Sequence, residues 1–104
     1  MSIDFSLQKM KLVDVSSRNI THNVSRMWVK AGIYEDIYNS EGKKASEIVK
    51  NLKRGYAEMK HDKQGYSKLN PENGWGSYER ALEFLKGLIE DCEEHPDAII
   101  DISK

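Results

Sequence analysis

The sequence predicts an α+β domain in which three helices pack on a small sheet formed by the N- and C-terminal strands. Apolar and polar residues alternate near each end of the chain, a pattern typical of half-buried strands. Between the ends, apolar residues recur every three or four positions, which is typical of amphipathic helices. A length of 104 residues fits a single domain covering residues 1–104.

The terminal strands are expected at residues 2–7 and 98–103. On the apolar side of the first segment are Ile3, Phe5 and Leu7, and on that of the last are Ala98, Ile100 and Ile102. We expect these strands to be neighbours in one sheet. Residues 11–15 alternate less cleanly and either continue the first strand or form a second. Residues 16–19 interrupt the pattern.

A first helix is expected to begin at Thr21, whose hydroxyl can cap backbone N–H groups, and to end at Gly32. Residues 33–38 follow as an apolar and aromatic turn or short helix. The second helix is expected at residues 43–61, with a break at Gln64 and Gly65. Residues 43–68 hold an excess of basic residues and residues 71–101 an excess of acidic ones, which favours attraction between the second and third helices.

The third helix is expected to be the central one and to run to His95, just before Pro96. Its apolar face consists of Trp75, Tyr78, Leu82, Leu85, Ile89 and Cys92, widened by Ala81, Phe84 and Leu88. So wide a face needs cover on more than one side. Ahead of it, Asn70 is expected to cap a single turn that begins at Pro71.

Composition excludes several classes of partner. The net charge of −1 gives no general attraction to nucleic acid or to membranes, and no apolar run is as long as a membrane span. Cys92 is the single cysteine, so no internal disulfide forms and the chain is expected to be cytoplasmic. The sequence leaves self-association open.

A first candidate binding site is the glycine-rich turn before the third helix. Gly74 and Gly76 permit tight backbone paths whose N–H groups can hold a phosphate or carboxylate, while Trp75 or Tyr78 can stack on a ring. Asn73 lies beside them and can orient a polar edge. The alternative is a purely structural turn, with Trp75 in the core.

A second candidate site is the polar run at the start of the first helix. Asn19, His22 and Asn23 can read the polar edge of a ligand, and His22 can also bind an anion. The alternative is a capping turn whose side chains satisfy backbone donors.

No motif in the sequence specifies a reaction. His22, His61 and His95 are far apart in the chain and have no recognised metal-ligand spacing, so we expect no metal and no cofactor. Cys92 lies on an apolar face, where cysteine usually acts as a small hydrophobic residue. We therefore expect a protein that is not an enzyme.

Three motifs give the chain a wider resemblance. They are NITHN at residues 19–23, NPENGWGSYE at residues 70–79 and PDA at residues 96–98. With them the chain resembles, over nearly its whole length, a family of short uncharacterised proteins found in phages, prophages and bacteria. The resemblance implies a role in the contest between phage and host, in which small proteins often sequester a signal or block a host protein.

The leading hypothesis is a non-enzymatic module that binds a small anionic, nucleotide-like ligand between the His22 turn and the Gly74–Gly76 turn. Such a phage protein would sequester a nucleotide-like immune signal. The alternative is an inhibitor or adaptor that acts on a host protein through an exposed aromatic patch around Trp28, Tyr34 and Tyr38.

Overall fold

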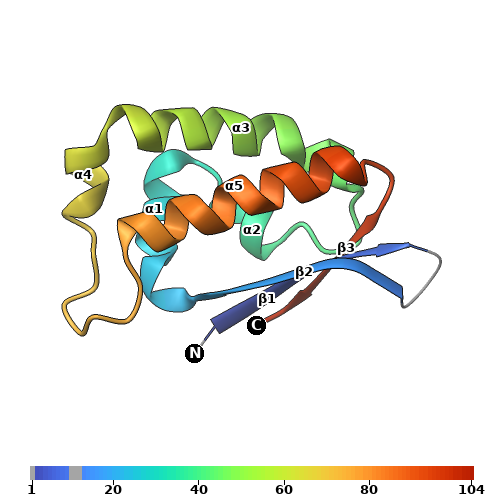
Figure 1. Ribbon diagram of the computed structural model, residues 1–104, viewed down its shortest axis with the longest axis horizontal. Coiled ribbons are helices and arrows are strands. Elements are labelled where there is room, and N and C mark those ends of the chain that lie inside the picture. Colours follow the sequence, from blue (N-terminus) through green and yellow to red (C-terminus); the bar gives the residue numbers. More distant parts are fainter. Residues whose placement is uncertain (1, 10–12) are drawn as a thin grey trace.

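The computed structural model describes residues 2–9 and 13–104 and confirms the α+β class. An antiparallel sheet forms one layer, and the helices form a second layer over one of its faces (Figure 1). The strands are β1 (Ser2–Lys9), β2 (Val13–Thr21) and β3 (Ile99–Ser103), in the order β2-β1-β3. The predicted pairing of the terminal strands is confirmed, with Phe5 opposite Ile102.

The strand β2 corrects the prediction of a break at residues 16–19. These residues pair with β1, and Arg18 lies opposite Phe5. The strand does not show apolar alternation because polar side chains occupy its inner face. There Ser16 and Arg18 both hydrogen-bond to Asp91 of the long C-terminal helix, which packs on the sheet. Of the ambiguous segment at residues 11–15, residues 11 and 12 lie outside the described residues, and the remainder begins β2.

The predicted helices are present, with shorter elements around them. After a 3₁₀ turn η1 (His22–Val24) come α1 (Ser25–Ala31), α2 (Tyr34–Tyr38), α3 (Ala45–His61), α4 (Lys63–Ser67) and α5 (Tyr78–Glu94). Gly32 ends α1 in the left-handed conformation, as expected. The break predicted at Gln64 and Gly65 is wrong, because the Asp62 carboxylate accepts a hydrogen bond from Gly65 N and caps α4 there.

The core lies between the sheet and the two long helices. Fully buried side chains come from β1, from α3 and from α5, among them Phe5, Leu52 and Leu85. Helix α5 passes over the sheet next to α3 (Figure 1), and Lys53 of α3 forms an ion pair with Glu93 of α5 at 2.9 Å. The ion pair between Lys53 and Glu93 is therefore an example of the attraction expected between the basic helix α3 and the acidic helix α5.

Helix α5 begins later than its apolar pattern indicated. Ser77 is its N-cap and accepts a hydrogen bond from Arg80 N. Positive φ angles at Gly74 (76°) and Gly76 (100°) keep the preceding turn out of the helix. Trp75 therefore leaves the apolar face, and 71% of it is exposed. The prediction that Trp75 lies on the apolar face of the helix is therefore wrong, and so is the alternative that Trp75 lies in the core.

The two edges of the sheet differ. Along the outer side of β3, Gly42 N donates to Ile100 O and Ile100 N donates to Lys43 O, so the loop before α3 occupies that edge. Strand β2 has β1 on one side, and in the described part of the chain no strand pairs with its other side. The edge of β2 is therefore the one open to a further strand.

Candidate functional site

The two polar motifs, distant in the sequence, meet in the structure. Asn23 Nδ2 donates to the backbone oxygen of Trp75 at 3.3 Å, across a separation of 52 positions. Gly76 packs so tightly that a β-carbon there would lie 2.7 Å from Thr21 Cγ2 and 3.0 Å from Val24 Cγ1. Only glycine therefore fits at this crossing, which brings the turn before α5 against the end of β2.

Hydrogen bonds on both sides of Trp75 hold this turn in shape. The Asn73 side-chain oxygen accepts from Trp75 N at 2.9 Å. The Asn70 side-chain oxygen accepts from Tyr78 N at 2.7 Å, so Asn70 binds the first N–H group of α5 in addition to the Ser77 cap, and not the predicted turn at Pro71. Tyr78 is buried, and its hydroxyl donates to Met59 O. The backbone next to the exposed indole is thus anchored at several points.

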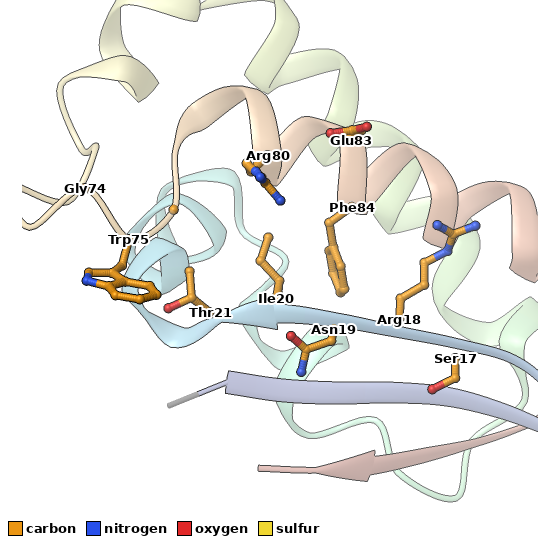
Figure 2. A pocket seen from close by; sticks show the side chains of 11 residues that line it. Ser17, Arg18, Asn19, Ile20, Thr21, Gly74, Trp75, Arg80, Glu83 and Phe84 are labelled. Atoms are coloured by element: carbon orange, nitrogen blue, oxygen red, sulfur yellow. The ribbon is translucent and has the colours of Figure 1, made fainter.

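On one side of Trp75 lies a hollow of about 660 Å³, here called the arginine hollow. It is lined by Ser17, Arg18, Asn19, Ile20, Thr21, Gly74, Trp75, Gly76, Arg80, Glu83 and Phe84. Figure 2 shows Trp75 at one end and Arg18 at the other, with Arg80 extending from α5 towards Ile20. The space thus lies between the outer edge of β2 and the first turns of α5.

The two arginines of this hollow differ in their availability. The Arg18 guanidinium forms an ion pair with Asp91 and lies against Gly87, where a β-carbon would come within 2.3 Å of it. Burial alone would raise the pKa of Asp91, but hydrogen bonds from Arg18 and Ser16 outweigh burial and hold that pKa below its ordinary value. Arg18 is therefore committed to joining β2 to α5.

Arg80 is exposed and has no ion pair or side-chain hydrogen bond within residues 2–9 and 13–104. Its guanidinium carries five donors that suit a phosphate or carboxylate. Glu83, one turn further along α5, is also exposed and lies at the hollow's outer rim (Figure 2). Arg80 is the side chain in this hollow best placed to bind an anion.

Trp75 also lines a second hollow of about 600 Å³, here called the asparagine hollow. Its lining consists of Ser2, Asn19, Thr21, Asn23, Asn73 and Trp75. All six residues are uncharged, and Asn19, Thr21 and Trp75 also line the arginine hollow. Trp75 thus lines both the arginine hollow and the asparagine hollow, which is rich in side-chain amides.

The backbone N–H groups proposed for anion binding are mostly engaged within the protein. Gly74 N donates to Pro71 O, and Trp75 N and Tyr78 N donate to asparagine side chains. Arg80 N donates to the Ser77 hydroxyl. Four of the expected backbone donors are therefore already used, and an anion depends on the Arg80 side chain for its charged contact.

His22 does not join the other predicted site residues. Its Nδ1 lies 2.7 Å from the Tyr38 hydroxyl, and it lines neither hollow. A 3₁₀ turn directs successive side chains apart, so His22 faces α2 while Asn23 faces Trp75. Burial, with a smaller contribution from Tyr34, raises the pKa of Tyr38 to about 12, so its hydroxyl stays protonated at neutral pH.

The aromatic patch expected for a protein inhibitor is not on the surface. Trp28 is fully buried and packs on Phe84, with ring centroids 5.9 Å apart. Tyr38 is also buried and stacks on half-buried Tyr34. These rings belong to the core because α1 and α2 fold back under α3, which the sequence pattern did not reveal.

The structure brings six of the predicted site residues together around the two hollows: Asn19, Asn23, Asn73, Gly74, Trp75 and Gly76. Tyr78 was included for stacking, yet it is buried in the core. Arg80 was missed. Its position immediately after the NPENGWGSYE motif, in the first turn of the helix, was the available signal.

Comparisons of the chain with protein-family models, curated proteins and solved structures found no match. The described residues contain no group of three or more histidine, cysteine or acidic side chains arranged to hold a metal ion. In the same part of the chain, no helix has the length and apolar character needed to cross a membrane. A function is therefore inferred from the site itself.

Proposed function

We propose that the protein binds a small anionic ligand with a flat ring, of nucleotide type, across Trp75 and does not transform it. The observation that carries this proposal is an exposed indole that lines two hollows, one with Arg80, which has no ion pair in the described part of the chain, and one with three asparagines. The ring of the ligand stacks on Trp75, and the polar edge of that ring forms hydrogen bonds with the asparagine amides. The phosphate of the ligand binds Arg80. Each ligand part thus has a chemically matched partner.

The arrangement favours binding because the Trp75 backbone is fixed before a ligand arrives. Bonds from Asn23 and to Asn73 hold the residue on both its carbonyl and its amide side. With the backbone held, only the two side-chain torsions of Trp75 remain to be ordered when a ligand binds. Stacking of a base on such a ring contributes about 1–3 kcal/mol, and a guanidinium adds a charge-assisted hydrogen bond to phosphate.

The family resemblance supplies a setting for this activity. In a phage or prophage protein of the cytoplasm, holding a nucleotide-like signal without converting it would lower the concentration available to a host immune receptor. Under this proposal the protein acts by its own abundance and its affinity, and it requires neither a cofactor nor a partner protein.

Calorimetric titration with nucleoside monophosphates tests the proposal. Trp75→Ala and Arg80→Ala should each weaken binding at least about fivefold, because they remove the stacking surface and the phosphate contact. The matched control is Arg26→Ala, which removes the same charge from an exposed residue that lines neither hollow. Failure of the wild-type protein to bind any nucleotide, or equal weakening by Arg26→Ala, would contradict the proposal.

A second candidate function is inhibition of a host protein, and the open edge of β2 is the observation that favours it. The arginine hollow runs along residues 17–21 of this strand, so an extended segment of another protein, or a second copy of this chain, has room to pair there. Hydrogen exchange separates the two functions. A strand partner protects backbone amides along β2, whereas a nucleotide protects the turn around Trp75.

A further inference from the structure

We infer that the ring selected by this site carries an exocyclic amino group, as adenine, guanine and cytosine do and uracil and hypoxanthine do not. The inference rests on the proposed function and specifies the ligand class of the same site. It follows from which hydrogen-bonding atoms of the asparagine hollow remain available once the protein's own bonds are counted.

Asn19 contributes an acceptor to the hollow. Its Nδ2 donates to Ser2 Oγ at 2.9 Å and to the Asp4 carboxylate, which uses both of its N–H groups. Figure 2 shows this nitrogen turned towards β1 and the oxygen turned away from it. The Asn19 Oδ1 atom has no partner within the described ranges and accepts from a ligand.

Asn23 and Asn73 contribute an acceptor and a donor beside the indole. Asn23 Nδ2 donates one of its two N–H groups to Trp75 O, which leaves its second N–H as a donor and Asn23 Oδ1 as an acceptor. Asn73 Oδ1 accepts from Trp75 N, which leaves both N–H groups of Asn73 Nδ2 available as donors. The hollow therefore offers two amide oxygens, both N–H groups of Asn73 and the second N–H of Asn23 to a ring stacked on Trp75.

The neighbours of each amide fix which end faces the ligand. Reversal of Asn19 would place its oxygen against the Asp4 carboxylate. Reversal of Asn23 would place its oxygen against the Trp75 carbonyl, and reversal of Asn73 would place its NH₂ group against Trp75 N–H. Each reversal replaces a hydrogen bond by repulsion between like dipoles, so the pattern is built into the fold.

This pattern complements an amino-bearing ring edge. An exocyclic amino group presents two N–H donors for the two amide oxygens, and the adjacent unprotonated ring nitrogen of adenine or cytosine accepts from Asn73. Guanine presents its amino group and N1–H as donors and O6 as the acceptor. Uracil and hypoxanthine present one N–H beside a carbonyl oxygen, so the ring gives a hydrogen bond to only one of the two amide oxygens.

Charge fixes the direction in which the ligand lies. The asparagine hollow is lined by uncharged side chains, and the Asp4 carboxylate that is bonded to Asn19 disfavours a phosphate near it. Arg80 lines the arginine hollow and not the asparagine hollow, and it attracts the phosphate to the arginine hollow. The base therefore occupies the asparagine hollow and the phosphate the arginine hollow.

The test uses ligand pairs that differ at the amino group and carry the same phosphate. Calorimetric titration should show adenosine monophosphate binding about tenfold more tightly than inosine monophosphate, and cytidine monophosphate about tenfold more tightly than uridine monophosphate. Asn23→Ala should reduce both ratios to less than about threefold, because one acceptor is lost. Arg80→Ala should weaken all four ligands and leave both ratios unchanged, because it contacts only the phosphate.

Ratios near one in the wild-type protein, with nucleotides still bound, would overturn this inference and leave the proposed function in place. Ratios that survive in Asn23→Ala would overturn the assignment to these amides. If none of the four nucleotides binds, both the inference and the proposed function are overturned. Thermal melts of each variant show whether a change in ratio comes from the site or from unfolding.

Discussion

The exposed indole of Trp75 shows how a single residue can escape a sequence pattern. Its spacing from Tyr78 suited the apolar face of the helix, yet positive φ angles at the flanking glycines turn the chain before the helix starts. The motif identified Trp75 and its asparagine neighbours as a group. It did not indicate which way each side chain points, and so His22 was included and Arg80 was omitted.

At the residue scale, Gly76→Ala should be more destabilising than Gly74→Ala. Both residues have positive φ, so alanine at either position costs about 1–2 kcal/mol in backbone strain. At Gly76 the new methyl group also overlaps Thr21 and Val24, whereas at Gly74 it meets open space. Urea denaturation of the two variants measures the difference. Equal losses would show that the two turns do not pack as closely as described.

At the scale of elements, α5 was the most predictable part of the chain and β2 the least. The apolar face of α5 is long and regular. The apolar residues on this face between Ala81 and Cys92 lie in the core as expected, with Leu82 half-buried. In β2 an ion pair replaces apolar contact on the inner face, so alternation disappears from the sequence. Long-range pairs such as Arg18 with Asp91 cannot be inferred from local spacing.

The central position of α5 predicts the effect of truncating its side chains. Leu85→Ala should lower the free energy of unfolding by about 2–5 kcal/mol, because Leu85 is fully buried and its removal leaves a cavity. Leu82→Ala is the matched control on the same helix, and it should lose less because Leu82 is only half-buried. Chemical denaturation gives both values. A loss below about 0.5 kcal/mol for Leu85→Ala would place the core face elsewhere.

At the scale of the whole molecule, the polar and apolar faces were predictable, whereas the hollows were not. The terminal strands, the two long helices and their layering follow from periodicity and from charge. The hollows depend on a crossing between residues 21–24 and 74–76 that only the folded chain creates. Likewise, the sequence did not reveal that a loop covers the edge of β3 while β2 stays open.

Buried tyrosine and thiol groups predict how the stability of the whole molecule changes with pH. Burial raises the pKa of Tyr38 and of Cys92 to about 12, above their ordinary values of 10.0 and 9.0. The unfolded chain therefore loses these protons first, and stability is complete below about pH 9 and falls as the pH rises towards 12.

Urea denaturation at pH 7, 9 and 10.5 checks this dependence, and the midpoint should decrease at the highest value. Tyr38→Phe provides the comparison, because it removes one of the titrating groups and should flatten the decrease relative to its own value at pH 7. A midpoint that stays constant or rises between pH 9 and 10.5 would show that these groups are not buried as described.

The central claim is that a nucleotide stacks on Trp75 with its phosphate at Arg80, and NMR titration with adenosine monophosphate tests it most directly. The indole N–H signal of exposed Trp75 should shift, together with the side-chain amides of Asn19, Asn23 and Asn73 and the Arg80 Nε–H group. The indole of buried Trp28 is the internal control and should move little. No shift at Trp75, or shifts confined to residues outside the two hollows, would contradict the claim.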